Sequence, residues 1–520
     1  MRRLALSIAF ISACAAPAHT TSAEDATLVV GRPADALLLD PAMVNDAESA
    51  EVCEQMYDHL TRFVRGSGDI EPALAESWDV TERGTQWTFH LRPGVRFSDG
   101  TPMNADAVVF SLERQRDPNH PFHRRGFGYW ESTYRNILSV NKVDDLTVRI
   151  VIERPYAPFL ANLAMYPASI VSPTAVRKWG DDFVRHPVGT GPFRLVEWAP
   201  GERVTLEANP NYWESRSPVN VKHLVFVTMR DARQRLVALE GGAVDIAESL
   251  APADLQFVTL HPELRLERVA GNNVGYLAMN TARPPFDDVR VRRAINHAVD
   301  RTPIVKLIYQ GLALPASGPL APSAWGHGEA PPYDFDPARA RALLAEAGYH
   351  TTKRPRLYVM STPRPYMPAP EDVARVLASN LHDVGIDVDI VVNPIAEHLR
   401  ATAAGEHDLC LRGWSGDNGD PDNFLFVLFD SDNAQRGSAT NVSFYKDAAL
   451  HGILQWAQES QDRGERVRFY QQADRIIHDA APWVPLAHAE IVVARRARVG
   501  GLVVSPSALL YFKDVRLERR

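Results

Sequence analysis

Residues 413–424, GWSGDNGDPDNF, place three aspartates and two asparagines between apolar runs. Oxygen-rich loops bind calcium in EF-hands, which need ligands at alternate positions, a glycine at position six and a glutamate at position twelve. Counted from Asp417, position three is Gly419 and position twelve is Leu428, so the EF-hand pattern is not met. Turn formation and binding of a cationic ligand group are the remaining interpretations.

Turn chemistry explains two of the three aspartates. Asp420 precedes Pro421, which predicts a helix N-cap with proline at the first helical position, and Asp422 favours the positive end of the helix dipole. Asp417 lies upstream, near Trp414, and a carboxylate beside an indole suits a cationic ligand group. The structural alternatives are an Asx turn for Asp417 and core packing for Trp414.

Motifs of catalysis are missing from the sequence. GWSGD (413–417) is not the G-x-S-x-G of a nucleophile elbow, and H-E-x-x-H, paired C-x-x-C and P-loop patterns do not occur. VGTGPF (188–193) reads as a turn rather than a nucleotide fingerprint. We therefore predict that the protein is not an enzyme and has no cofactor or metal; a secreted hydrolase would need a nucleophile–base pair or a metal set.

Composition and the N-terminus indicate an exported protein. A net charge of −8 over 520 residues gives no sign of nucleic-acid or anionic-membrane binding. Residues 1–23 combine Arg2 and Arg3, an apolar run and small residues, as a secretory signal does. ISAC (11–14) is the alternative, a lipobox that would anchor the protein through Cys14. Cys53 and Cys410 are expected to be separate buried thiols.

The periodicity of the chain predicts an α/β fold with mixed sheets. We expect one helix over 48–63, one that begins after Asn104, and one over 288–311 that ends at Gly311. We also expect a hairpin over 188–213 and a parallel βαβ unit over 357–394. The pattern restarts near residue 270. We therefore predict one lobe over 24–269 with an inserted subdomain, a second over 270–487, and a C-terminal return, 488–520, to the first lobe. Two crossings between lobes make a hinge.

Five segments together resemble the solute-binding proteins of the peptide/nickel class of ABC importers. They are residues 74–111, PVGTGPFRL (187–195), ANPNYW (208–213), NVGYLAMN (273–280) and DVRVRRAINHAVDR (288–301). The resemblance implies a two-lobed, Venus-flytrap fold, a location in the periplasm, a monomer, and delivery of solute to a membrane permease with ATPase subunits.

RPYMP (364–368) and GWSGDNGDPDNF (413–424) are most similar to the dipeptide-binding branch of that class. The resemblance implies that Asp417 binds the α-ammonium of a short peptide and Arg364 its α-carboxylate, with Trp414, Tyr366 and Asn418 as further lining residues. A guanidinium offers a bidentate fork to a carboxylate, which lysine cannot. The short-range cysteine pairs of the relatives are absent here.

Other ligands remain open within the same fold: haem, glutathione, δ-aminolevulinate, an oligopeptide or a nickel chelate. A receptor for defence peptides is a further alternative from a related branch. Retention of both Asp417 and Arg364 favours a short zwitterionic peptide.

Overall fold

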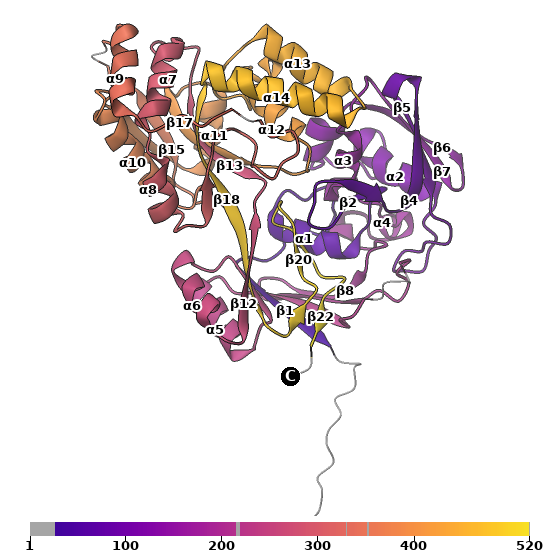
Figure 1. Ribbon diagram of the computed structural model, residues 1–520. Helices are drawn as coiled ribbons and strands as arrows, with labels where there is room; N and C mark the ends of the chain where they lie inside the picture. Colours follow the sequence, from indigo (N-terminus) through magenta and orange to yellow (C-terminus); the bar gives the residue numbers. More distant parts are fainter. Residues whose placement is uncertain (1–25, 215–218, 329, 351–352, 519–520) are drawn as a thin grey trace, which may run out of the picture.

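A computed structural model describes residues 26–214, 219–328, 330–350 and 353–518 (Figure 1). A sheet of 12 strands runs through the molecule. One part, lobe I, contains β8 (Phe193–Ala199), β9 (Arg203–Ala208), β10 (His223–Thr228), β1 (Thr27–Arg32) and β11 (Ile246–Glu248). The other part, lobe II, contains β13 (Asn273–Met279), β17 (Leu409–Ser415), β15 (Arg356–Met360) and β16 (Asp389–Asn393).

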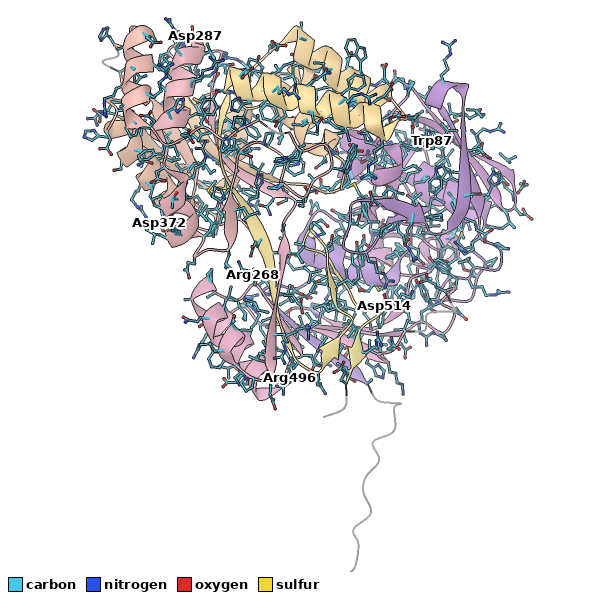
Figure 2. All side chains as sticks on the ribbon, in the orientation of Figure 1. Trp87, Arg268, Asp287, Asp372, Arg496 and Asp514 are labelled. Atoms are coloured by element: carbon cyan, nitrogen blue, oxygen red, sulfur yellow. The ribbon has the colours of Figure 1, made fainter. Side chains whose placement is uncertain are left out.

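Two long antiparallel stretches connect the lobes. β18 (Trp483–Arg496) has 14 residues and pairs with both β11 and β13. β12 (Leu264–Ala270) lies along β18 and leads directly into β13. Arg268 on β12 pairs with Glu490 on β18 at 2.6 Å, so side chains as well as the ladder join the two strands (Figure 2). At about 3.4 Å per residue, β18 alone is long enough to reach from one lobe into the other.

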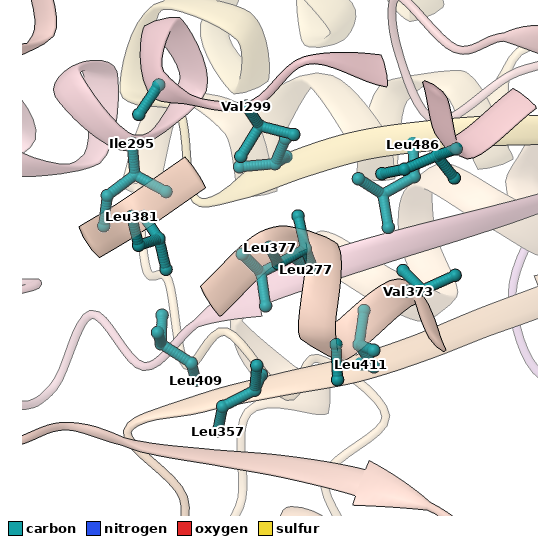
Figure 3. Close-up of a cluster of buried hydrophobic side chains, with 14 of the residues drawn as sticks. Leu277, Ile295, Val299, Leu357, Val373, Leu377, Leu381, Leu409, Leu411 and Leu486 are labelled. Atoms are coloured by element: carbon teal, nitrogen blue, oxygen red, sulfur yellow. The ribbon is translucent and has the colours of Figure 1, made fainter. Parts of the chain in front are cut away.

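The sheet of lobe II is buried on both faces. Every residue of β13 is buried, and its side chains alternate: Leu277 and Met279 join one core cluster, whereas Tyr276 and Ala278 join another. In the first cluster, helices α7 (Val289–Ala298) and α10 (Pro370–His382) pack Ile295 and Leu377 onto the sheet (Figure 3).

The C-terminal segment belongs to the core of lobe I. Val499, Leu510 and Phe512 pack in the same cluster as Leu28 and Val30 of β1. A separate sheet, ordered β4 (Ala75–Thr81), β5 (Gln86–Leu91), β7 (Thr147–Ile152) and β6 (Ile137–Asp144), is covered by α2 (Ala105–Arg116) and has its own core around Trp87 (Figures 1 and 2).

Several predicted elements are confirmed. β8 and β9 form the hairpin, β15 and β16 pair in parallel around α10, and Asn104 caps α2 by accepting from the Ala107 amide at 3.2 Å. Cys53 and Cys410 are free and buried. Residues 1–23 and Cys14 lie outside the described residues. None of the described helices has the length and apolar character that a membrane span requires.

The predicted helix over 48–63 is too long. α1 (Ala47–Met56) ends at Met56, and Thr61–Phe63 form strand β2. The turn at 188–193 packs against this helix end: the Gly191 amide donates to the Met56 carbonyl at 2.9 Å, and a Cβ on Gly191 would lie 2.5 Å from the same carbonyl carbon. The tertiary contact, not the local sequence, sets the end of the helix.

Two further predictions need correction. The helix over 288–311 breaks after Ala298, because Asp300 caps a new turn by accepting from the Thr302 amide at 2.9 Å. The N-cap of α12 (Asp422–Phe429) is Pro421 rather than Asp420, although Asp420 still accepts from the Asp422 amide at 3.0 Å.

Candidate ligand-binding site

The loop between β17 and α12 uses two of its three aspartates for structure. Buried Asp420 accepts hydrogen bonds from Arg466 at 2.6 Å and Tyr470 at 3.2 Å. Asp422 accepts from Gln458 at 2.9 Å and from Tyr156 of lobe I at 3.1 Å. Burial, together with the charge of Asp420, raises the pKa of Asp422 to about 7. These two carboxylates therefore hold the loop in place.

Asp417 is different, because its carboxylate faces open space. It lines two adjacent cavities of about 320 and 250 Å³ between the lobes. Water reaches the side chain from the cavities, yet protein atoms surround it on most sides, and this desolvation raises its pKa to about 6. No hydrogen bond or ion pair to its carboxylate is found within the described part of the chain. Of the three aspartates in this loop, Asp417 is thus the one that lines the described cavities.

Trp414 supports the loop rather than the cavity wall. Its indole nitrogen donates to Asn423 Oδ1 at 2.9 Å, and the Asp417 amide donates to the same oxygen at 3.2 Å. The ring packs against the lobe II core, and Trp414 is not a lining residue of either cavity. Trp414 and the Asp417 backbone are therefore held by the same Asn423 side chain.

Asn418 connects the two lobes. Its side-chain amide donates to Asn162 Oδ1 of lobe I at 2.7 Å, and its carbonyl accepts from Asn272 at 3.0 Å. Its Oδ1 accepts from the Asp420 amide at 3.0 Å. Asn418 lines the 320 Å³ cavity, but both polar atoms of its side chain are already hydrogen-bonded within the protein.

Arg364 and Tyr366 occupy a tight turn beside the cavity. Arg364 and Met367 exchange backbone hydrogen bonds of 3.0 and 2.8 Å, and Pro365 between them lines the 250 Å³ cavity. The Tyr366 ring lies directly over Gly413 of β17, where a Cβ would meet ring carbon Cδ2 at 2.1 Å. The Arg364 side chain is exposed, and the described structure does not place it in the wall of either cavity.

Aromatic side chains that the sequence reasoning missed form much of the opposite wall. Tyr129 and Tyr166 of lobe I line the 250 Å³ cavity with ring centroids 5.5 Å apart, in an edge-to-face arrangement. Burial and the charge of Asp417 raise the pKa of Tyr129 to about 12. Tyr129 caps the helical turn Trp130–Tyr134 and Tyr166 begins the turn Tyr166–Ala168, so the rings come from separate short helices of lobe I and no local pattern marks them. Phe63, Asn272 and Ser507 line both cavities and were also missed.

The lobes touch around these cavities. The Ala157 amide of lobe I donates to the Gln458 carbonyl of lobe II at 2.6 Å, and Arg463 pairs with Asp69 at 2.6 Å. Gly68 and Gly419 bring backbone against backbone, since a Cβ on Gly419 would lie 2.3 Å from Gly68 Cα. The two cavities therefore lie where the lobes are in contact, and Asp417 lines both of them.

The profile of the bacterial extracellular solute-binding proteins, family 5 Middle, matches residues 69–436. Heme-binding protein A of Haemophilus influenzae is 36% identical over 500 residues, which cover 92% of this chain and 90% of that protein. The dipeptide-binding protein of Escherichia coli K12 is 36% identical over 480 residues, 89% of each chain. The solved structure of the ABC transporter-associated periplasmic binding protein DppA from Helicobacter pylori, in complex with the peptide STSA, matches with a TM-score of 0.79 and 34% identity over 95% of this chain and 98% of that one.

The chain therefore belongs to the family 5 bacterial extracellular solute-binding proteins. Its fold is the two-lobed periplasmic-binding-protein fold of mixed α/β type. The relatives named above are solute-binding proteins, as the sequence analysis predicted for this chain.

Proposed function

We propose that this protein is the periplasmic receptor of an ABC importer, which binds dipeptides or other short peptides between its lobes and delivers them to the membrane permease. The family assignment and the peptide-binding relatives support the transport role. In this proposal the lobes comprise residues 24–269 with 488–520 and residues 270–487, the protein is a monomer without catalytic activity, and residues 1–23 direct export.

One observation carries the peptide assignment: the Asp417 carboxylate lies partly desolvated at the junction of two cavities, and no residue in the described ranges forms a hydrogen bond or ion pair with it. A charged group in this position is costly until an opposite charge arrives. The α-ammonium of a peptide supplies that charge and three hydrogen-bond donors. The Tyr129 and Tyr166 rings add aromatic surface that favours a cation.

Arg364 completes the proposal at the other end of the ligand. Its turn is fixed by the bonds to Met367 and by Tyr366 packed on Gly413, and its exposed guanidinium interacts with the Tyr366 side chain. In this proposal the guanidinium turns from Tyr366 toward a peptide carboxylate. A carboxylate and a guanidinium held at a fixed spacing bind both charged ends of a zwitterion and therefore select ligands of one length. In this proposal Asn418 lines the space between the two ends, and Tyr366, which lines neither cavity, supports the Arg364 turn from Gly413.

Haem is the second candidate, because a relative of 36% identity is a heme-binding protein. Haem carries two propionates and no ammonium, so it leaves Asp417 unpaired. Titration with hemin, followed in the Soret region, separates the two ligands: the peptide proposal predicts no saturable change in the absorbance band.

The decisive experiment is calorimetric titration of protein that has been unfolded and refolded to remove any carried-over ligand. Ala-Ala is compared with N-acetyl-Ala-Ala at equal pH and salt. The proposal predicts that Ala-Ala binds and that acetylation abolishes binding, because the amide nitrogen no longer carries a charge. Equal binding of the two peptides would show that no α-ammonium is recognised.

A further inference from the structure

The 250 Å³ cavity is acidic on both of its sides. Asp417 lines it from lobe II, and Asp46 and Glu54 line it from lobe I, at the start and in the last turn of α1. Its aromatic lining residues are Phe63, Tyr129, Tyr166 and Tyr511. The residues described as lining this cavity include no arginine, lysine or histidine. The wall thus offers negative charge and aromatic faces, the two features that favour cations.

Glu54 is a second carboxyl group in this wall, besides Asp417, that accepts no hydrogen bond from a described residue. Asp46 is used in part, because its Oδ1 caps α1 by accepting from the Ser49 amide at 2.8 Å, whereas its buried Oδ2 accepts no hydrogen bond from a described residue. The Glu54 side chain is only 8% exposed, and its ion-pair contact with His59 Nε2 is 3.8 Å long, too long for a hydrogen bond. Burial lowers the pKa of His59 to about 4, so the imidazole is neutral at pH 7 and does not balance the charge of Glu54. His59 Nε2 has no hydrogen-bond partner among the described residues either.

The cations on the far side of Glu54 are already paired with other acids. Glu54 also borders a smaller cavity of about 60 Å³. Besides His59, the described lining of this cavity includes three basic side chains, Arg62, Arg65 and Lys513. These are paired as follows: Arg62 with Glu71 and Glu214, Arg65 with Asp514, and Lys513 with Glu214. None of them forms an ion pair with Glu54 in the described structure.

We propose that Glu54 is a specificity-determining residue, which binds a second cationic group of the ligand and makes the receptor prefer short peptides that carry a lysine or arginine side chain. This inference rests on the proposed function, in which Asp417 binds the α-ammonium. A neutral side chain would leave Glu54 buried and unpaired, whereas an ammonium or guanidinium satisfies it. Tyr511, beside Glu54, adds an aromatic contact for the same cation.

The protonation state of Glu54 gives a second testable consequence, the release of a proton when a cationic ligand group binds. Burial and the charge of Asp58 raise the pKa of Glu54 to about 8, so the group is mostly protonated at pH 7. Two sets of charged and titratable side chains surround it. Those around the small cavity are Tyr57, Asp58, His59, Arg62, Arg65, Tyr212, Tyr511 and Lys513, and those around the large cavity are Asp46, Tyr129, Tyr166 and Asp417. An arriving ammonium stabilises the ionised carboxylate, and the proton leaves to the buffer.

The test compares peptides that differ in one charge. Lys-Ala and Ala-Lys are titrated against Met-Ala and Ala-Met at pH 7, each in two buffers of different ionisation enthalpy. Methionine matches the unbranched shape of lysine without the ammonium. We expect at least one lysine peptide to bind roughly tenfold or more tightly than its methionine counterpart, and to release a proton that the methionine peptide does not.

Two variants test whether Glu54 causes the preference for lysine peptides and the proton release. Glu54→Gln is expected to equalise the lysine and methionine peptides and to abolish the extra proton release. Glu48→Gln makes the same change on the same helix, at a residue that lines neither cavity, and should retain both effects. If the glutamine variant of Glu54 does not fold, the wild-type affinities and proton counts still decide the inference.

The outcomes separate the two proposals. Binding of Ala-Ala with equal affinity for lysine and methionine peptides overturns the role of Glu54 and leaves the peptide receptor standing. A lysine preference that persists in Glu54→Gln overturns the role of Glu54 as well. Failure of every peptide to bind overturns the proposed function and this inference together.

Discussion

Replacement of Asp417 by asparagine is the sharpest perturbation of the proposed site, because it removes the charge and keeps the shape. In the ligand complex, loss of one partner of a desolvated charge pair costs about 2–5 kcal/mol, or roughly thirtyfold to several thousandfold in affinity. The same change should not harm the empty protein, since no described side chain pairs with this carboxylate. Weaker peptide binding without loss of stability is the expected signature.

The direction of the stability change follows from the pKa. A value of about 6 in the folded chain lies roughly two units above that of an unfolded aspartate, so the ionised group disfavours folding at neutral pH. Two units correspond to a free-energy cost of about 3 kcal/mol for a fully buried carboxylate. Because water reaches Asp417 from the cavity, solvent screening lowers this cost to about 1 kcal/mol. Asp417→Asn should therefore stabilise the empty protein slightly at pH 7, and the gain should disappear below about pH 4.

Peptide affinity should have the opposite pH dependence. The ammonium binds the ionised carboxylate, so affinity falls as the pH drops through about 6, with about a tenfold loss between pH 7 and pH 5. Calorimetry of Ala-Ala with wild type and Asp417→Asn across this range, with thermal unfolding of both proteins, checks all three statements. Wild-type affinity in the asparagine variant, or a marked loss of its stability, would refute the reasoning.

Three further predictions address the surroundings of Asp417. Arg364→Lys should weaken Ala-Ala binding about tenfold or more, because the bidentate fork is lost; equal affinity in calorimetry would remove the carboxylate role. Gly419→Ala should weaken peptide binding without changing the unfolding temperature, because its Cβ would lie 2.3 Å from the backbone of Gly68 in the facing lobe and keep the lobes apart. Wild-type affinity, or wild-type small-angle scattering of the peptide-bound variant, would show that this contact does not limit lobe closure. Asp420→Asn should destabilise the protein by about 3–5 kcal/mol by leaving Arg466 buried without its partner, measured by urea unfolding; a loss below about 1 kcal/mol would contradict that assignment.

The local elements of the fold follow from sequence wherever a local signal decides them. Asn104 caps its helix as predicted, and the Pro-Gly pair between β8 and β9 closes a hairpin, because both depend on residues a few positions apart. The helix predicted over 48–63 fails at Met56, where a turn more than 130 residues away occupies the end of the helix. Periodicity alone cannot register such a contact.

For the site, the sequence by itself singled out the carboxylates of 413–424 and excluded the EF-hand, because spacing and turn chemistry are local properties. The sequence also set Asp417 apart, since turn chemistry accounted for Asp420 and Asp422. Tertiary structure added the partners of those two aspartates, Arg466 and Tyr156, which come from distant segments, and the cavities that Asp417 lines. It also brought the tyrosines and Glu54 of lobe I to the same cavity as Asp417. These groups meet only because the chain crosses between lobes along β12 and β18, and burial and charge at such a meeting point depend on residues that are remote in sequence.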